Sequence, residues 1–186
     1  MYVCRVNRCR SAMAELMLRD LLSLSGHAAD VLVGSAGIEA VGGAPVVADA
    51  ARVLAERGVD SSAFVSRRLR ADLVERADLI LTAGRDHRDT VVRLVPDAAD
   101  RCFTLLQFRR LADGIEGLPQ WNQAWTLELI RSAIANRGRR PAARPEDNDL
   151  TDPTGHGRRW VRRCADRIAE SQEVFRWGLA GRRPSG

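Results

Sequence analysis

The chain has 186 residues, of which 45% are hydrophobic and 28% are charged, so it is long enough to bury a core, and its composition excludes disordered, collagen-like and coiled-coil proteins. No apolar run approaches the roughly 20 residues that a membrane helix needs, and no secretory signal is visible, which predicts a cytoplasmic protein without a membrane partner. All 29 basic residues are arginine and the net charge is +5, which reflects either a genomic preference for arginine codons or a negatively charged partner.

Short apolar runs alternate with helical periodicities through the first 105 residues. Strands are predicted at 1–3, Asp30–Gly34, Asp78–Thr82 and Cys102–Leu105, with a turn at Ser35–Gly37. Helices are predicted at 13–24 with Ser11 as the cap, and at 47–57, 71–76 and 87–94. Strands that alternate with helices in this way favour an α/β fold of three layers, α/β/α, around a four-stranded parallel sheet.

The pattern changes after residue 105. A helical insertion is predicted over 107–137, broken at Gly117-Leu118-Pro119, and is followed by a loop rich in proline and charge. The last helix is predicted over 158–179, and the tail 181–186 is expected to fray. No repeat or second domain is visible, so we expect one domain over 1–186, in which the insertion serves as a lid or as the surface of an oligomer.

The four cysteines do not form a metal-binding pattern, because no C-x-x-C pair occurs and the chain has only three histidines. We therefore expect no metal and no other cofactor, and free thiols in a reducing compartment. Cys102 and Cys164 fit the core. Cys4 and Cys9 do not, because they lie in a polar loop that is dense in arginine.

The segment Cys4–Ser11 carries the candidate chemistry, because it connects a strand to a helix. In an open α/β sheet such a loop lies where ligands bind, and its inward N–H groups and the helix dipole form an anion cradle. This cradle favours the thiolate of Cys4, an in-line nucleophile toward a bound phosphate. Arg10 is expected to grip two phosphate oxygens, and Ser11 to hydrogen-bond the thiolate. The remaining phosphate-binding or substrate-binding positions are Arg5, Val6, Asn7, Arg8 and Cys9.

The string C-x-x-N-x-C-R-S-x-M-A-E resembles the phosphate-binding loop of the low-molecular-weight protein tyrosine phosphatases and of the arsenate reductases that share their fold. The resemblance covers most of the chain, through S-A-G at 35–37, S-R-R-L at 66–69, A-D-L-I-L-T at 77–82 and Asp152-Pro153. It implies a metal-independent hydrolase that forms a phosphocysteine, with Ser35 as a supporting residue. It also implies that Asp152 is the general acid and base, with Asp149 and Asp147 as alternatives.

Three positions depart from the pattern of this family, and one of them is Ala12, which stands where proline is usual. Val6 stands where glycine is usual, so we expect a distorted cradle if that position needs a positive φ. Phe64 stands where the family has a histidine that supports the loop. The buried polar network around Asn7, Ser11 and Ser35 is therefore expected to be incomplete.

The expected walls of the site also differ from those of phosphotyrosine-specific members. The loop 38–41 offers no aromatic side chain, and His156, a candidate substrate contact, follows the Asp-Pro pair in place of tyrosine. Arg5 and Arg8 then indicate a substrate with further negative charge, unless they only face solvent. A replacement wall, or alternatively part of the core, is expected from Trp121, Trp125 and Trp160. His87 is interpreted as a capping or surface residue.

These observations favour a phosphomonoester hydrolase that acts on an anionic substrate other than simple protein phosphotyrosine. The alternative is a descendant of the fold that binds or transforms another anionic small molecule without hydrolysis. Arsenate reduction is disfavoured because Ala83-Gly84-Arg85 replaces the expected relay cysteines, and nucleic-acid binding because no basic stripe with interleaved aromatics occurs. Cys9 lies close enough in sequence to pair reversibly with Cys4, which suggests a redox switch.

Overall fold

A computed structural model describes residues 1–113, 115, 118, 121–142 and 144–181. Its strands are β1 (Tyr2–Cys4), β2 (Ser35–Gly37), β3 (Ile80–Thr82) and β4 (Cys102–Thr104). They form a parallel sheet in the order β2-β1-β3-β4, in which Tyr2 pairs with Ser35 on one side and with Leu81 on the other. The predicted four-stranded parallel sheet is thus confirmed, and the loop that follows β1 lies at the edge formed by the carboxyl ends of the strands.

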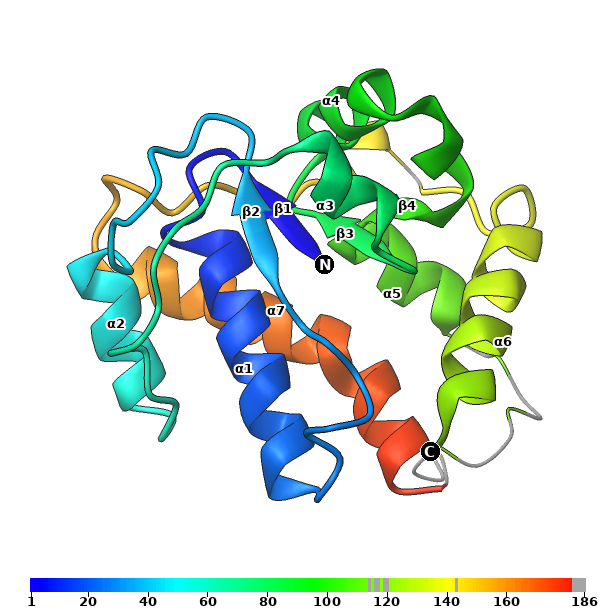
Figure 1. Ribbon diagram of the computed structural model, residues 1–186, viewed down its shortest axis with the longest axis horizontal. Coiled ribbons are helices and arrows are strands. Elements are labelled where there is room, and N and C mark those ends of the chain that lie inside the picture. Colours follow the sequence, from blue (N-terminus) through cyan, green and yellow to red (C-terminus); the bar gives the residue numbers. More distant parts are fainter. Residues whose placement is uncertain (114, 116–117, 119–120, 143, 182–186) are drawn as a thin grey trace.

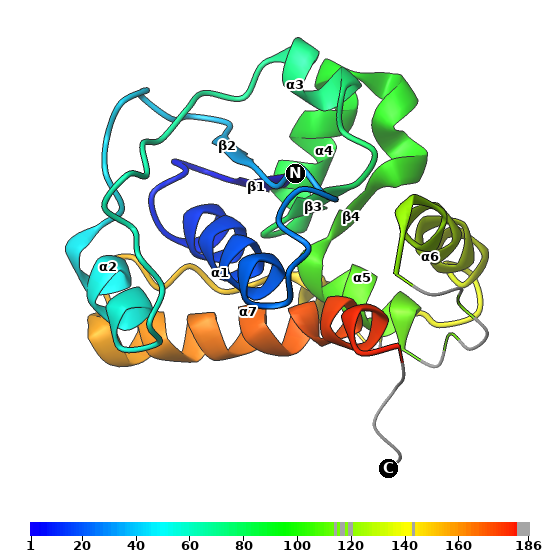
Figure 2. The same cartoon turned by 60° about the horizontal axis from the view of Figure 1, so that its bottom comes forward.

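Helices cover both faces of this sheet, as Figures 1 and 2 show. On one side, α7 runs beneath α1 and α5, and α2 lies beside α1; α3 and α4 lie on the other side. The helices and 3-10 turns are α1 (Arg10–Leu24), α2 (Ala48–Ala55), α3 (Ala71–Glu75), α4 (Arg85–Leu94), η1 (Pro96–Arg101), α5 (Leu105–Ala112), α6 (Gln123–Ala135), η2 (Pro145–Asn148) and α7 (Arg158–Leu179).

Each face of the sheet has its own core, because successive side chains of a strand point in opposite directions. Tyr2, Leu81 and Phe103 pack with the buried residues of α1, α5 and α7. Their neighbours Val3 and Ile80 pack with the buried residues of α3 and α4. The long helix α7 has the predicted bounds and the predicted inner face, with Val161, Cys164, Ile168 and Phe175 all buried.

The second strand lies one segment later than predicted. The run Asp30–Gly34 forms no strand, and its Leu32 is 99% exposed, whereas Ser35–Gly37 pairs with β1 over its full length. Strand β2 consists of serine, alanine and glycine, and all three residues are buried. The strand is therefore part of the interior although it contains no large apolar side chain. Apolar content alone therefore pointed to the wrong segment.

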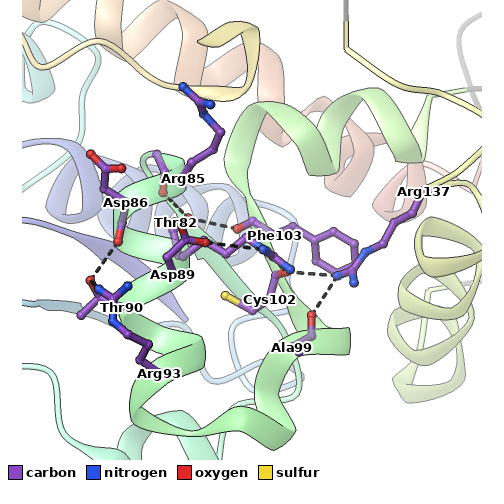
Figure 3. A network of polar contacts seen from close by, with 12 residues as sticks. Thr82, Arg85, Asp86, Asp89, Thr90, Arg93, Ala99, Cys102, Phe103 and Arg137 are labelled. Carbon is purple, nitrogen blue, oxygen red and sulfur yellow. Dashed lines mark hydrogen bonds and ion pairs between the residues drawn. The ribbon is translucent and has the colours of Figure 1, made fainter. Parts of the chain in front are cut away.

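The segment predicted as a helical insertion forms most of α5, which packs in the core, and α6, which lies at the β4 end of the sheet, away from the loop that follows β1 (Figure 1). It is anchored there by Arg137, whose Nη2 donates to the carbonyls of Ala99 and Cys102, each at 3.1 Å, as Figure 3 shows. Its guanidinium also lies 4.2 Å from the centre of the Phe103 ring. The predicted break at Gly117 and Pro119 and the tail beyond Gly181 lie outside the described residues. In the described part of the chain, no helix combines the length and apolarity needed to cross a membrane.

Candidate active site

The loop between β1 and α1 turns at Asn7, which has a φ of 56°. Among the described residues other than glycine, it alone adopts a left-handed backbone conformation. Asparagine tolerates this conformation better than most residues, and β-branched valine does not. Val6 does not carry the positive φ, so the distortion that we expected at this position is not found. The cradle keeps its turn because the demanding conformation falls one residue later.

The Asn7 side chain forms the centre of a buried polar network. Its Nδ2 donates to Ser11 Oγ at 3.0 Å and to Ser35 Oγ at 2.7 Å. Its Oδ1 accepts from the backbone N–H of Arg67 at 2.8 Å, and Ser35 Oγ in turn donates to Glu15 Oε2 at 2.6 Å. Each of these buried groups therefore has a partner, which stiffens the loop.

The expectation of an incomplete network is therefore wrong. Phe64 joins the hydrophobic core, and the carboxylate of Glu15 supplies a buried partner from the second turn of α1. Glu15 was part of the motif string, but its type and position alone did not reveal that it would reach Ser35.

Cys4 lies at the base of the loop and is 2% exposed. Its Sγ is 2.9 Å from Ser11 Oγ. Ser11 is not the helix cap that we expected, since α1 begins at Arg10 and is preceded by Cys9. The hydroxyl turns back toward the loop, where it can stabilise a thiolate.

Gly37 allows the loop to lie directly on β2. A Cβ at this position would be 2.8 Å from the backbone N of Asn7 and 2.8 Å from the carbonyl carbon of Val6. Real side chains do not approach backbone atoms this closely. The glycine is thus part of the local structure that shapes the loop.

Arg10 connects this loop to the C-terminal segment. Its guanidinium is largely buried and donates through Nη1 to the carbonyl of Leu150 at 3.1 Å, and through Nη2 to Asp152 Oδ2 at 2.5 Å. The Asp152 side chain remains 43% exposed. Burial acts to raise the pKa of Asp152, but hydrogen bonds from Thr154 and the positive charge of Arg10 outweigh it, so this pKa lies below the usual aspartate value.

The two alternative acids have other partners. Asp149 accepts from the backbone and side chain of Arg85, and Asp147 accepts from the backbone and side chain of Arg144. Of the three carboxylates, Asp152 is the one bound to Arg10, at the rim of the loop.

His87 is a residue of the site that the sequence interpretation missed. It lies in the first turn of α4, and its buried Nδ1 has no hydrogen-bond partner among the described residues. Burial lowers its pKa, and the charge of Arg10 lowers it further, so the ring is neutral at pH 7. The available signal was its position just after β3, at the sheet edge where ligands bind in parallel α/β folds.

A pocket of about 410 Å³ opens beside the loop, between the segment after β2 and one side of α4. Arg5 lies in its wall and binds Glu39 Oε2 through Nε at 2.7 Å, so a carboxylate already neutralises this arginine. Figure 3 shows the polar side chains that α4 contributes. The pocket is lined by Arg5, Ile38, Glu39, Asp86, His87, Asp89, Thr90 and Arg93.

The other expected site residues lie around the loop in different roles. Arg8 donates through Nε to the carbonyl of Pro45 at 2.9 Å, and Cys9 is buried, which raises the pKa of its thiol to about 12. His156 is exposed, and its ring centre lies 5.4 Å from that of Trp160, so it belongs to the outer rim. Trp125 is buried in the core, where Trp121 packs against it, which excludes both as walls of the pocket.

No group of three or more His, Cys, Asp or Glu side chains in the described ranges is arranged to hold a metal ion. The four thiols are free and buried. The arrangement offers instead a buried thiol, a guanidinium fork and an exposed carboxylate at one end of the sheet. These groups together suit nucleophilic attack on an oxyanion and proton transfer to its leaving group.

Comparison with known proteins gives a consistent family. The family model described as "Low molecular weight phosphotyrosine protein phosphatase" matches residues 1–117. A protein-arginine-phosphatase of Geobacillus stearothermophilus is 36% identical over 114 residues, which is 61% of this chain and 73% of that protein. EpsP of Ralstonia nicotianae, described as a probable low molecular weight protein-tyrosine-phosphatase, is 46% identical over 103 residues, 55% of this chain and 67% of that protein.

Solved structures agree with this assignment. The low molecular weight protein tyrosine phosphatase from T. tengcongensis superposes with a TM-score of 0.68 at 26% identity, and the match covers 94% of each chain.

The relatives found by sequence also include an arsenate reductase of Brevibacillus brevis, with 38% identity over 100 residues, which is 54% of this chain and 68% of that protein. The comparisons therefore include relatives named for three different substrates.

Proposed function

Because the chain belongs to the low molecular weight phosphotyrosine protein phosphatase family and is a cysteine-dependent phosphatase, we propose that it hydrolyses a phosphomonoester through a phosphocysteine on Cys4. One observation carries this proposal. The buried thiol of Cys4 lies 2.9 Å from the hydroxyl of Ser11, at the base of a loop whose Arg10 also binds the carboxylate of Asp152. The nucleophile is thus paired with Ser11 and the oxyanion clamp with the acid, and Arg10 and Ser11 are consecutive residues at the start of α1.

In the first step, the Cys4 thiolate attacks phosphorus and the bond from phosphorus to the leaving oxygen breaks. The Arg10 guanidinium binds two of the non-bridging oxygens, and the proton of Asp152 passes to the leaving oxygen. In the second step, the Asp152 carboxylate removes a proton from water, which attacks phosphorus. The bond between sulfur and phosphorus breaks, and its electron pair returns to Cys4 as the thiolate.

The pairing of Arg10 with Asp152 links substrate binding to the proton that the first step needs. In the free protein the hydrogen bonds from Thr154 and the charge of this guanidinium together hold the pKa of Asp152 below its usual value, against the effect of burial. A phosphate that occupies the cradle competes for the same N–H groups. Release of the carboxylate from Arg10 beside a bound dianion favours its protonated form, which is the form that a general acid requires.

The proposed substrate is an anionic phosphorylated compound other than simple protein phosphotyrosine. The support lies in the pocket beside the loop, whose lining is mostly charged and, among the described residues, includes no phenylalanine, tyrosine or tryptophan. A plain phenyl ring would find no aromatic side chain to pack against in this lining, whereas a polar leaving group can hydrogen-bond to it. Because Glu39 neutralises Arg5, the positive charge beside the cradle is smaller than the sequence suggests.

Phosphate release from a panel of substrates tests the proposal. The panel contains 4-nitrophenyl phosphate, a sugar phosphate, a phosphotyrosine peptide and a phosphoarginine peptide. We expect Cys4→Ser to lose turnover on all of them, and Cys102→Ser, which removes a buried thiol of β4, to retain it. Turnover that survives Cys4→Ser would refute the phosphocysteine, and a clear preference for the phosphotyrosine peptide would refute the substrate class.

A further inference from the structure

The acid loop, defined here as Asp149–Asp152, is held at both ends. At its far end, Asp152 binds Arg10. In its middle, the N–H of Leu150 donates to the carbonyl of Ala83 at 2.8 Å. At its near end, the Asp149 carboxylate binds the start of α4. We infer that Asp149 is a positioning residue that holds Asp152 at the mouth of the cradle, an inference that rests on the acid role proposed for Asp152.

The contacts of Asp149 are specific and directional. Its Oδ1 accepts from the backbone N–H of Arg85 at 2.8 Å, and its Oδ2 accepts from Nε and Nη2 of the same residue at 3.0 and 2.9 Å. A fork-shaped pair of this kind fixes both the position and the orientation of a carboxylate. Arg85 is the first residue of α4, where an unpaired N–H and the helix dipole both favour a negative charge.

The chain around this contact is shaped to receive it. A Cβ at Gly84 would lie 3.3 Å from Asp149 Oδ1 and 3.5 Å from His87 Nδ1, so the glycine makes room for both side chains. In Figure 3, the side chain of Arg85 leaves the start of α4 in the opposite direction from Arg93. Arg85 therefore binds the acid loop, whereas Arg93 lines the pocket.

Two other contacts support the acid loop: Leu150 packs in the hydrophobic core, and Arg110 of α5 donates to Asn148 Oδ1 at 2.7 Å just before the loop. Residues 144–147 before it and 154–160 after it are exposed. Leu150 is buried, but its two anchoring hydrogen bonds involve only its backbone. The side chain of Asp149 is thus the contact that ties this end of the loop to α4, while Asp152 itself is nearly half exposed. Displacement of a catalytic group by about 1 Å is enough to lower a rate strongly.

Leaving-group dependence separates positioning of an acid from general support of the fold. An activated leaving group such as 4-nitrophenolate departs without a proton, whereas an alkoxide needs one. We compare kcat/KM of Asp149→Asn with that of the unaltered protein on 4-nitrophenyl phosphate, phenyl phosphate and an alkyl phosphate. We expect a loss within about twofold on the first and of about fivefold to tenfold on the last. Asp152→Asn should show the same trend with a larger loss.

Three further variants complete the experiment. Asp166→Asn breaks a comparable ion pair, between α7 and Arg57 just after α2, which does not involve the acid loop, and should lower kcat/KM equally little on every substrate. Arg85→Gln should reproduce part of the effect of Asp149→Asn, because the backbone N–H contact survives. In an Asp152→Asn background, Asp149→Asn should cause no additional leaving-group dependence, because it acts through the residue already removed.

The possible failures differ from one another. An equal loss on all three substrates would overturn the inference in favour of a purely structural role. A leaving-group dependence that adds to that of Asp152→Asn would overturn it in favour of Asp149 as an acid in its own right. If Asp152→Asn shows no leaving-group dependence while Cys4→Ser is inactive, the acid assignment fails and the inference fails with it, but the phosphocysteine stands.

Discussion

The replacement of Gly37 by alanine gives a sharp test of how the loop is shaped. The added Cβ would lie 2.8 Å from two backbone atoms of the loop, at Val6 and Asn7, and 2.9 Å from the Cβ of Ala40. None of these is the free end of a flexible side chain, so the loop or β2 must move by several tenths of an ångström. Overpacking of this kind costs about 1–3 kcal/mol, which corresponds to a lowering of Tm by about 3–9 °C in a protein of this length.

The effect on activity should be larger than the effect on stability. A shift of the loop displaces the donors that bind phosphate, and a misplacement approaching 1 Å costs about 100-fold in rate. Turnover of 4-nitrophenyl phosphate and Tm are measured on Gly37→Ala and on Gly42→Ala, a matched control in the same segment. A Cβ at Gly42 would meet its nearest atom, a carbonyl oxygen, at 3.8 Å. Equal behaviour of the two variants would refute the reasoning that the loop rests directly on β2.

Three other predictions address the polar network, the acid and the second cysteine of the loop. Ser35→Ala removes a hydroxyl that joins a buried amide to a buried carboxylate, and should lower the free energy of unfolding by about 1–3 kcal/mol in urea denaturation; a stability unchanged from that of the unaltered protein would contradict the network. Sulfate affinity, measured by calorimetry, should rise by at most about tenfold per pH unit as the pH falls through the titration of Asp152, because protonation of this carboxylate frees Arg10 and removes a negative charge. Asp152→Asn should abolish this dependence on pH, and a dependence that persists in the variant would exclude the linkage. Inactivation by peroxide should be reversed by a dithiol and become irreversible in Cys9→Ser, as it would if Cys9 pairs with Cys4; full recovery of that variant would argue against a redox switch.

The position of the candidate phosphate loop was predictable from the chemical groups of its residues. Cys4, Arg10 and Ser11 each supply a group that an anion site needs, and they come between a strand and a helix. The Asp152-Pro153 pair, which resembles that of a known family, indicated that Asp152 lies at this site, and the structure pairs it with Arg10. The sequence also indicated the parallel sheet and the bounds of α7 to within a residue.

Features that depend on contact between distant segments were not predictable. Arg5 is paired with Glu39, so it adds less positive charge to the site than its position in the loop suggested. β2 was missed because a strand between two covered faces can be built from serine, alanine and glycine, without a run of large apolar residues. His87 was interpreted as a capping or surface residue because nothing local reveals that its Nδ1 is buried and that it lines the pocket beside the loop.

The bond between Arg10 and the acid loop also has a consequence for how the site forms. Its two partners, the carbonyl of Leu150 and the carboxylate of Asp152, lie 140 and 142 positions later in the chain. Contacts that close such a long loop cost more chain entropy and form more slowly than those of the cradle, whose partners Ser35 and Arg67 lie 28 and 60 positions from Asn7. We therefore expect the segments around the Cys4 thiol to form before the proposed proton donor, Asp152, docks against Arg10. We expect catalytic competence to appear last during folding, so that the first turnover of a refolding sample marks the docking of its C-terminal third.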